Sequence, residues 1–488
     1  MTVANRSHHR RSPSSGGRSS RPSGSTIMMR HWRDQLDFLI LCALLILIAL
    51  GGGSAFADTL SLIYVRLAAV AALVAFALTP AQAQWRTFCV PVILLVLLAV
   101  LITIQLVPLP PSIWSALPGR APYLEAAAGL DGIQPWRPLS LTPDLTVNSL
   151  VSLVVPAAVL VGFVKLTADQ RRWLVVAFIL LCIASMAIGV AQVAGGKNSV
   201  LYTYKRTYEG TAVGLLANRN HQGALLAALF PALRVWTLFP VSDQRWARRR
   251  FWLAVAIGIV AVPVLLATGS RAGILLGVAS LVVTLLLFAP NRAQRAGAWP
   301  SPLQARALQI GIPALLVVLV LATWWFGRAL SIQRLVGGAP SLEDDLRFRF
   351  APLVVHIIER TFPVGTGFGS FDPIFRQYEP DAILIDSYFN HAHNEVLEIL
   401  LTAGAAGAVL LTLFVAWWVV SVIRALRDTA NPARRLALLG GMVTGILMAA
   451  SLVDYPLRTP LLGAWFAIGC GWLCVRNADA VAKATTLP

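Results

Sequence analysis

The feature that most constrains the fold of this chain is a series of apolar segments, each about as long as a bilayer is thick. A helix needs about 20 residues to cross the hydrocarbon core. Backbone groups in lipid must be hydrogen-bonded within their own segment, so such segments form helices. The sequence therefore predicts an all-α, polytopic integral membrane protein of about 12 transmembrane helices. We expect these helices near residues 36–56, 60–79, 88–107, 146–164, 173–193, 221–240, 251–268, 272–289, 307–326, 394–423, 437–453 and 460–475.

The composition agrees with a membrane protein and argues against a nucleic-acid partner. Of the 488 residues, 57% are hydrophobic and only 13% are charged, which is too few to cover a soluble protein of this size. The formal charge of +18 comes from short basic clusters between apolar segments. That pattern is typical of loops retained in the cytoplasm. The five cysteines have no metal-binding spacing, and we interpret them as small apolar residues.

The distribution of Lys and Arg sets the expected topology. A basic tail rich in Ser, Gly and Pro, residues 1–35, is expected to be disordered and cytoplasmic. The transmembrane domain then covers 36–475, and a second cytoplasmic tail covers 476–488. The longest loop, 327–392, falls on the opposite, outer side of the membrane. No small-residue cleavage site follows the first apolar segment, so we interpret it as a retained helix.

Arginines in the outer loops run against this retention rule and call for an explanation. An arginine fork matches a phosphate or pyrophosphate bidentately, which suits a lipid pyrophosphate head group at the membrane edge. The alternative is that these side chains reach toward the interface and pair with Asp344, Asp345, Glu395 or lipid phosphates. A functional role is preferred for Arg271, which lies in a tight turn between two expected helices. The outer arginines are Arg219, Arg271, Arg347, Arg349 and Arg458.

Four of the seven histidines also fall on the outer side: His221, His356, His391 and His393. His393 precedes Asn394 and stands about one turn before Glu398. An imidazole there can accept a proton from an attacking hydroxyl, with Glu398 to orient it. The alternative is a histidine that only caps the helix. The HxH pair has no third ligand at a clear spacing, so no metal is expected.

Three further features are interpreted as structural. Arg66 and Arg234 lie within expected membrane helices and are assigned to structure. The Gly-rich stretch 364–370 lacks the Lys-Ser/Thr of a nucleotide-binding loop, and we interpret it as a turn packed against the membrane surface.

Several of these motifs occur in an order that resembles the bacterial O-antigen ligase superfamily, which also contains O-antigen and exopolysaccharide polymerases. The resemblance extends from about residue 36 to residue 475, and it depends on the ordered set rather than on any single motif. Its motifs are ANRNHQGALLA at 217–227, TGSRAG at 268–273, DLRFRFAPLVVHIIERTFPVGTGFGSFDPIFRQYE at 345–379 and HAHNEVLEILLTAGAAG at 391–407, with QLVPLPPSIW at 105–114 and VDYPLRTP at 453–460 as further marks.

The resemblance implies a GT-C-like glycosyltransferase of the bacterial inner membrane, with its active site facing the periplasm. Such an enzyme takes a glycan from undecaprenyl pyrophosphate and needs neither a metal nor another cofactor. A ligase passes the glycan to the lipid A-core, and a polymerase passes it to growing polysaccharide on another lipid. Both remain open. A transporter or flippase is less favoured, because the polar residues crowd the outer face and the two halves show no repeat.

By position, the resemblance also suggests roles for the outer residues. Arg219 and Arg271 would hold the pyrophosphate, and either Arg347 or Arg349 would close over it from the large loop. His393 fits the family histidine better than His391 does. The predicted catalytic residues are His393, Arg271 and Glu398, and the predicted substrate-binding residues are Arg219, Arg347, Arg349, His221, His391, Asn394 and Arg458.

Overall fold

The computed structural model describes residues 24–56, 58–79, 83–129, 134–288, 342–381, 389–429, 431 and 433–475. This part of the chain is helical apart from two short strands. The strands pair antiparallel, with Pro108 opposite Pro138 and Leu109 opposite Arg137. In chain order the elements are α1 (Gly24–Gly51), α2 (Ser61–Leu78), α3 (Trp85–Ile104), β1 (Pro108–Leu109), α4 (Pro111–Trp114), α5 (Ala121–Ala128), β2 (Arg137–Pro138), α6 (Pro143–Ser152), α7 (Val154–Lys165), α8 (Ala168–Gly195), α9 (Arg219–Thr237), α10 (Gln244–Ala267), α11 (Arg271–Leu287), α14 (Leu342–Thr361), α15 (Phe371–Tyr378), α16 (Glu395–Arg427), α17 (Arg434–Ala450), η3 (Pro456–Arg458) and α18 (Pro460–Cys474).

The helices make this a helical membrane protein. Six helical stretches among the described residues are long and apolar enough to cross a bilayer, and three apolar helices are shorter. The count of about 12 spans stays a prediction, since the expected span near 307–326 lies outside the described residues. The six stretches are Ser61–Leu78, Trp85–Ile104, Pro143–Lys165, Ala168–Gly195, Gln244–Ala267 and Glu395–Arg427.

The first helix differs from the expectation at both ends. It begins at Gly24, inside the segment expected to be disordered, and it ends at Gly51 rather than near residue 56. The early end follows from a close approach. A Cβ on Gly53 would lie 1.9 Å from the carbonyl oxygen of Leu215, so only a glycine fits where the chain passes this loop. The remainder of the expected tails, 1–23 and 476–488, lies outside the described residues.

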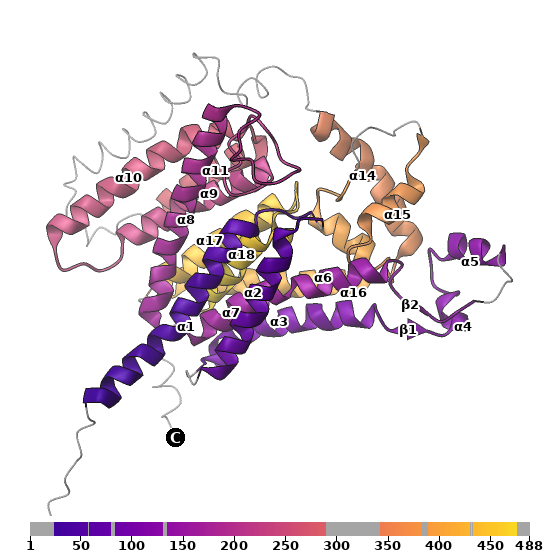
Figure 1. Ribbon diagram of the computed structural model, residues 1–488, viewed down its shortest axis with the longest axis horizontal. Helices are drawn as coiled ribbons and strands as arrows, with labels where there is room; N and C mark the ends of the chain where they lie inside the picture. The colour runs from indigo at the N-terminus through magenta and orange to yellow at the C-terminus, as the bar shows by residue number, and fades with distance from the viewer. Residues whose placement is uncertain are drawn as a thin grey trace, which may run out of the picture.

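The core is built around α9, α17 and α18. Figure 1 shows α17 and α18 in the centre, with α8, α9 and α11 on one side and α3, α6 and α16 on the other. Residues 221–233 of α9 are all buried, as expected for a helix surrounded by other helices. Small residues let α9 approach α11 closely: a Cβ on Gly223 would lie 2.6 Å from the Cα of Gly273. This contact brings the N-termini of the two helices together.

Helix α16 is kinked at Gly404, which has φ 55° and ψ −141°. The Gly-rich loop after α14 is inserted at this point. The amide of Ala405 donates to the Pro363 carbonyl at 2.9 Å, and the amide of Gly367 donates to the Thr402 carbonyl at 2.8 Å. These bonds replace helical ones that the kink removes. The loop 364–370 is therefore packed into α16, which corrects its interpretation as a turn at the membrane surface.

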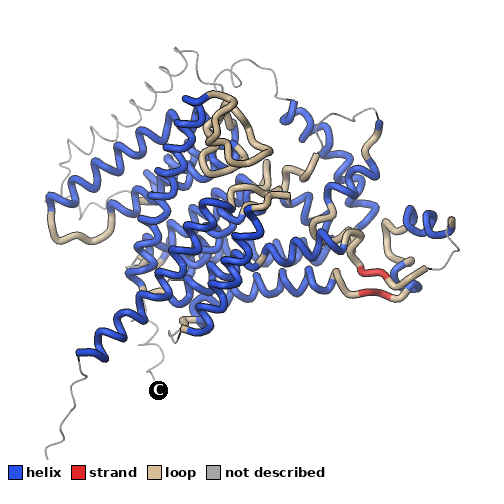
Figure 2. Tube along the Cα trace, viewed as in Figure 1, coloured by secondary structure: helices blue, strands red, loops and turns tan. Residues whose placement is uncertain are grey.

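The segment expected to be the long outer loop, 327–392, contains ordered helices. Both α14 and α15 lie beside the N-terminal half of α16 (Figure 1). The β1–β2 hairpin, with α4 and α5, projects beyond α3 at one end of the molecule (Figure 2). Helices α14 and α15 thus cover the N-terminal half of α16.

Candidate functional site

Three helices begin at the same place, and the loop between α17 and α18 joins them. These are α9, α11 and α16, whose first residues are Arg219, Arg271 and Glu395. A helix N-terminus carries unpaired N–H groups and a partial positive charge, so converging N-termini favour an anion. The polar side chains predicted from sequence gather here, at two neighbouring clusters.

The first cluster lies where α9 and α11 begin. Asn218 caps α9, and Ser270 caps α11 by accepting from the Gly273 amide at 2.9 Å. The Ser270 hydroxyl also donates to Oδ1 of Asn220 at 2.7 Å, which ties the two caps together. Each cap is followed directly by an arginine. Arg219 is buried with its guanidinium 4.6 Å from the ring centre of Tyr208, and Arg271 is half-buried.

Asp454, from the loop before α18, is the acceptor that holds this cluster. It is 1% exposed. The amides of Asn218 and Asn220 donate to its Oδ2 at 3.2 and 2.6 Å. Nε2 of His221 lies 3.5 Å from Oδ1 of the same carboxylate. A buried carboxylate needs such donors to offset the loss of water. Asp454 therefore fixes the start of α9 relative to the α17–α18 loop.

The second cluster lies in the first turn of α16. Nδ1 of His391 is 2.8 Å from Oε1 of Glu398, which is 1% exposed. The other carboxylate oxygen accepts from the Ala392 amide at 3.0 Å. Nη2 of Arg458 lies 3.1 Å from Oε1. Glu398 thus orients His391, whereas the sequence predicted that Glu398 orients His393.

The backbone conformation of His393 explains why His391, and not His393, contacts Glu398. Among the described residues it is the one non-glycine residue with positive φ, at 51°. That left-handed turn directs the chain so that His391 faces Glu398, while Nδ1 of His393 bonds the His391 carbonyl oxygen at 2.8 Å. The His393 ring stacks on Phe389 at 4.9 Å. Asn394 caps α16 by accepting from the amides of Val396 and Leu397.

Arg458 joins the α17–α18 loop to α16. Its Nε and Nη2 bind the two carboxylate oxygens of Glu395 at 2.8 and 2.9 Å. Burial alone would lower the pKa of Arg458, but the carboxylates of Glu395 and Glu398 raise it well above its ordinary value. The arginine stays charged at any physiological pH and holds both carboxylates in place.

Tyr455 links the two clusters. Its ring centre lies 5.4 Å from that of His221, 4.3 Å from that of His391 and 5.1 Å from that of His393. It follows Asp454 directly in the chain, so one short loop contacts both halves of the site. The sequence did not single out Asp454 or Tyr455, although both lie in the VDYPLRTP stretch.

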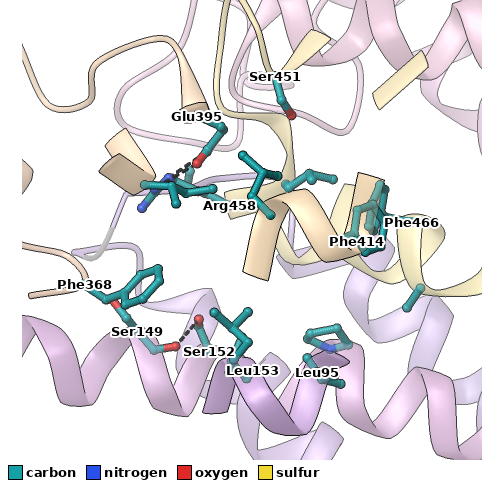
Figure 3. Close-up of a pocket in the computed structure, with 18 of the residues that line it drawn as sticks. Leu95, Ser149, Ser152, Leu153, Phe368, Glu395, Phe414, Ser451, Arg458 and Phe466 are labelled. Atoms are coloured by element: carbon teal, nitrogen blue, oxygen red, sulfur yellow. Dashed lines mark hydrogen bonds and ion pairs between the residues drawn. The ribbon is translucent and has the colours of Figure 1, made fainter. Parts of the chain in front are cut away.

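A cavity of about 840 Å³ adjoins the second cluster. Its polar end includes His391, Glu395 and Arg458, and the opposite end is apolar. In Figure 3 the Glu395–Arg458 pair lies on one wall, Ser149 and Ser152 lie on the facing wall, and Phe414 and Phe466 close the far side. The shape and chemistry suit a molecule with a polar head and an apolar tail.

Eight of the ten predicted site residues are brought together. Arg349 is exposed on α14, and the side chain of Arg347 lies outside the described residues. No group of three His, Cys, Asp or Glu side chains suited to a metal occurs in the described part of the chain. The residues that gather at the site are Arg219, His221, Arg271, His391, His393, Asn394, Glu398 and Arg458.

Comparison with protein families identifies part of this chain. The family model described as O-antigen ligase matches residues 259–412, a stretch that includes Arg271, His391 and Glu398. The match confirms the resemblance inferred from the ordered motifs. No curated protein matches the chain.

Proposed function

The match of residues 259–412 to the O-antigen ligase model supports membership of that superfamily. On that premise we propose that the chain transfers a glycan from undecaprenyl pyrophosphate to a sugar acceptor on the periplasmic face of the bacterial inner membrane. The observation that carries the proposal is the meeting of two arginine-bearing helix N-termini with a carboxylate-oriented histidine. The first supplies a site for an anionic leaving group, and the second supplies a base.

The pyrophosphate of the donor binds between Arg219 and Arg271 in this proposal. Both arginines are the first residue of a helix, so their charge adds to that of the helix N-terminus. The two caps are tied through Asn220 and Ser270, which fixes the spacing of the helix ends. Fixed positive charge stabilises the charge that grows on the pyrophosphate as it leaves.

The acceptor hydroxyl is activated by His391. Its Nδ1–H donates to Glu398, which leaves Nε2 as the proton acceptor. The acceptor oxygen bonds to C1 of the donor sugar while the C1–O bond to the pyrophosphate breaks. The hydroxyl proton moves to Nε2 of His391, and polyprenyl pyrophosphate departs with its electron pair. This is a direct displacement with inversion at C1. His393, the base predicted from sequence, here holds the loop that carries His391.

Replacement of Arg271 tests the donor site. In detergent, purified protein would be given a lipid-linked glycan donor and a sugar acceptor, and product would be counted with a labelled glycan. Arg271→Ala should lower transfer about 10²–10³-fold, the usual effect of removing one group that stabilises a transition state. Arg172→Ala is the matched control, since Arg172 pairs with Asp169 at an exposed position in α8. An Arg271→Ala protein that transfers at the wild-type rate would refute the proposal.

The same site chemistry serves a ligase and a polymerase. A ligase donates to the lipid A-core, and a polymerase donates to another lipid-linked repeat. Gel profiles of surface glycans from a deletion strain separate the two: a lost ligase leaves long polymer unattached to the core, and a lost polymerase leaves single repeats.

A further inference from the structure

One cation beside the cavity at His391 has no carboxylate partner in the part of the chain that the structure describes. Arg458 is bound by Glu395 and Glu398. Asp372, which also lines the cavity, is bound by Arg376 at 2.7 Å. Those pairs leave one cation among the described lining residues without a carboxylate, and it is Arg66.

Arg66 stands within a membrane helix. It is the sixth residue of α2, about 8 Å along the axis from the helix start. Within the described part of the chain, its polar partner is a neutral amide: Nη1 donates to Oδ1 of Asn148 in α6 at 2.8 Å. A cation at such a depth is costly unless it is paired with a counter-charge or with backbone carbonyl oxygens, and neither is found for Arg66 among the described residues. The arrangement calls for an anion that the protein itself does not provide.

Arg234 shows what a structural arginine in this membrane domain looks like. Its Nη2 donates to the Phe288 carbonyl at 2.6 Å and its Nη1 donates to Thr237 at 3.4 Å. It lies in the last turn of α9 and caps the C-terminal end of α11. Arg66 instead lines the cavity beside Asn148, next in the chain to Ser149, which Figure 3 shows on the wall facing the Glu395–Arg458 pair. The assignment of Arg66 to structure is therefore replaced.

We propose that this cavity binds the acceptor as a polyprenyl pyrophosphate-linked glycan, with the acceptor's phosphates against Arg66 and its chain among the apolar residues. The inference rests on the proposed function and names the substrate class that stands beside His391. It makes the reaction a polymerisation, in which the glycan from one lipid is joined to the glycan on another.

The lining of the cavity favours its assignment to the acceptor. In a direct displacement the attacking oxygen and the leaving pyrophosphate are on opposite sides of C1. The base must be on the attacking side. His391 is part of the cavity's lining, and the described lining residues include neither Arg219 nor Arg271. The cavity thus adjoins the base but not the two arginines proposed to hold the donor's pyrophosphate.

The size of the cavity and its one cation without a described carboxylate partner favour a lipid with one chain. The walls come mainly from α2, α3, α6, α7, α16, α17 and α18, whose lining residues are mostly apolar, and they enclose about 840 Å³. A lipid A acceptor has several acyl chains and two separate phosphates, which would need a wider surface and more than one cation.

Lipid stoichiometry tests the inference without any transfer. The full chain, in detergent, would be titrated with undecaprenyl pyrophosphate and the bound lipids counted by native mass spectrometry. Wild-type protein should bind two lipids. Arg66→Gln should lower the affinity for one of the two lipids about tenfold or more, as expected for the loss of a charge-assisted contact. Arg271→Ala should lower the affinity for the other lipid, and the double variant should lower the affinity for both. Arg66→Lys should still bind the lipid that Arg66→Gln binds weakly, because the cation remains.

The outcomes separate this inference from the proposed function. Two lipids bound to the Arg66→Gln protein with unchanged affinity would overturn the acceptor site and leave the donor site standing. A single lipid on the wild type, weakened alike by Arg66→Gln and Arg271→Ala, would also overturn it, because the cavity would then hold the donor. Arg172→Gln, at an exposed ion pair, should bind two lipids like the wild type.

Discussion

Nδ1 of His391 lies 2.8 Å from Oε1 of Glu398, and this hydrogen bond joins the loop before α16 to the first turn of that helix. The carboxylate fixes both the ring orientation and the tautomer, because the nitrogen that faces Glu398 must carry the proton. The second carboxylate oxygen binds the amide of Ala392, so the loop cannot turn away without losing two bonds. His391 itself lines the cavity.

His391 is expected to be the base and His393 a support. His391→Ala should lower kcat by about 10²–10⁴-fold, the range for loss of a general base, with little change in the KM for donor. His393→Ala should lower kcat far less, since its ring packs on Phe389 and contacts no reacting atom in this proposal. Steady-state transfer rates of the two purified variants give the comparison. A larger loss of kcat for His393→Ala than for His391→Ala would reverse the assignment.

Glu398 is expected to act through His391 as a positioning residue. Glu398→Gln keeps the side-chain shape but removes the charge that holds the ring and Arg458. We expect kcat to fall about 10–100-fold, or ~1.4–2.8 kcal/mol in the barrier, while the KM for acceptor stays near the wild-type value. Glu395→Gln is the matched control one turn away, because Glu395 binds Arg458 and not His391. Equal losses in the two variants would mean that Glu398 serves only the ion pair.

The sequence predicted that most of these residues share one side of the membrane, because the order of the helices decides that. Helices of membrane length alternate in direction, so Arg219, Arg271 and His391 fall on one side whatever their packing. The family motifs then reduced the outer arginines and histidines to a smaller set of candidates, and most of these gather at the site. The helix starts of α9, α11 and α16 all follow Asn or Ser caps that are visible in the sequence.

The contacts between side chains within the site could not be predicted from the sequence. A helical spacing puts His393 nearer to Glu398 than His391 is, and only the left-handed backbone at His393 reverses that order. The kink at Gly404 is hidden inside a continuous apolar run, because the bonds that replace its helical ones come from a loop some 40 residues earlier. Arg66 looked structural, since the cavity that it lines is formed by helices far apart in the chain.

Asp454 is expected to hold the donor site together. In Asp454→Asn one acceptor oxygen becomes an NH₂ group, which would face the donor groups of Asn218 and Asn220. A buried donor left unpaired costs about 1–3 kcal/mol, so the thermal midpoint of the purified protein should fall. The KM for donor should rise with it, because the caps of α9 and α11 lose their common anchor. Asp169→Asn, at an exposed ion pair of α8, should leave both measurements unchanged. A variant with normal stability and normal donor KM would contradict this role.

Gly404 is expected to set the direction of the α16 segment that carries Glu398. Its φ of 55° disfavours any L side chain, and an added Cβ would lie 2.1 Å from the carbonyl oxygen of Pro363. Gly404→Ala should therefore cost about 1–3 kcal/mol of stability and displace the Gly-rich loop. Since Glu395 and Glu398 precede the kink, transfer should fall together with stability. Gly258→Ala is the control: its Cβ would meet only Leu233, at an ordinary 3.8 Å, and alanine favours the helix by about 1 kcal/mol. Thermal unfolding in detergent compares the two, and a Gly404→Ala protein as stable as Gly258→Ala would show that the kink is not needed to hold the site.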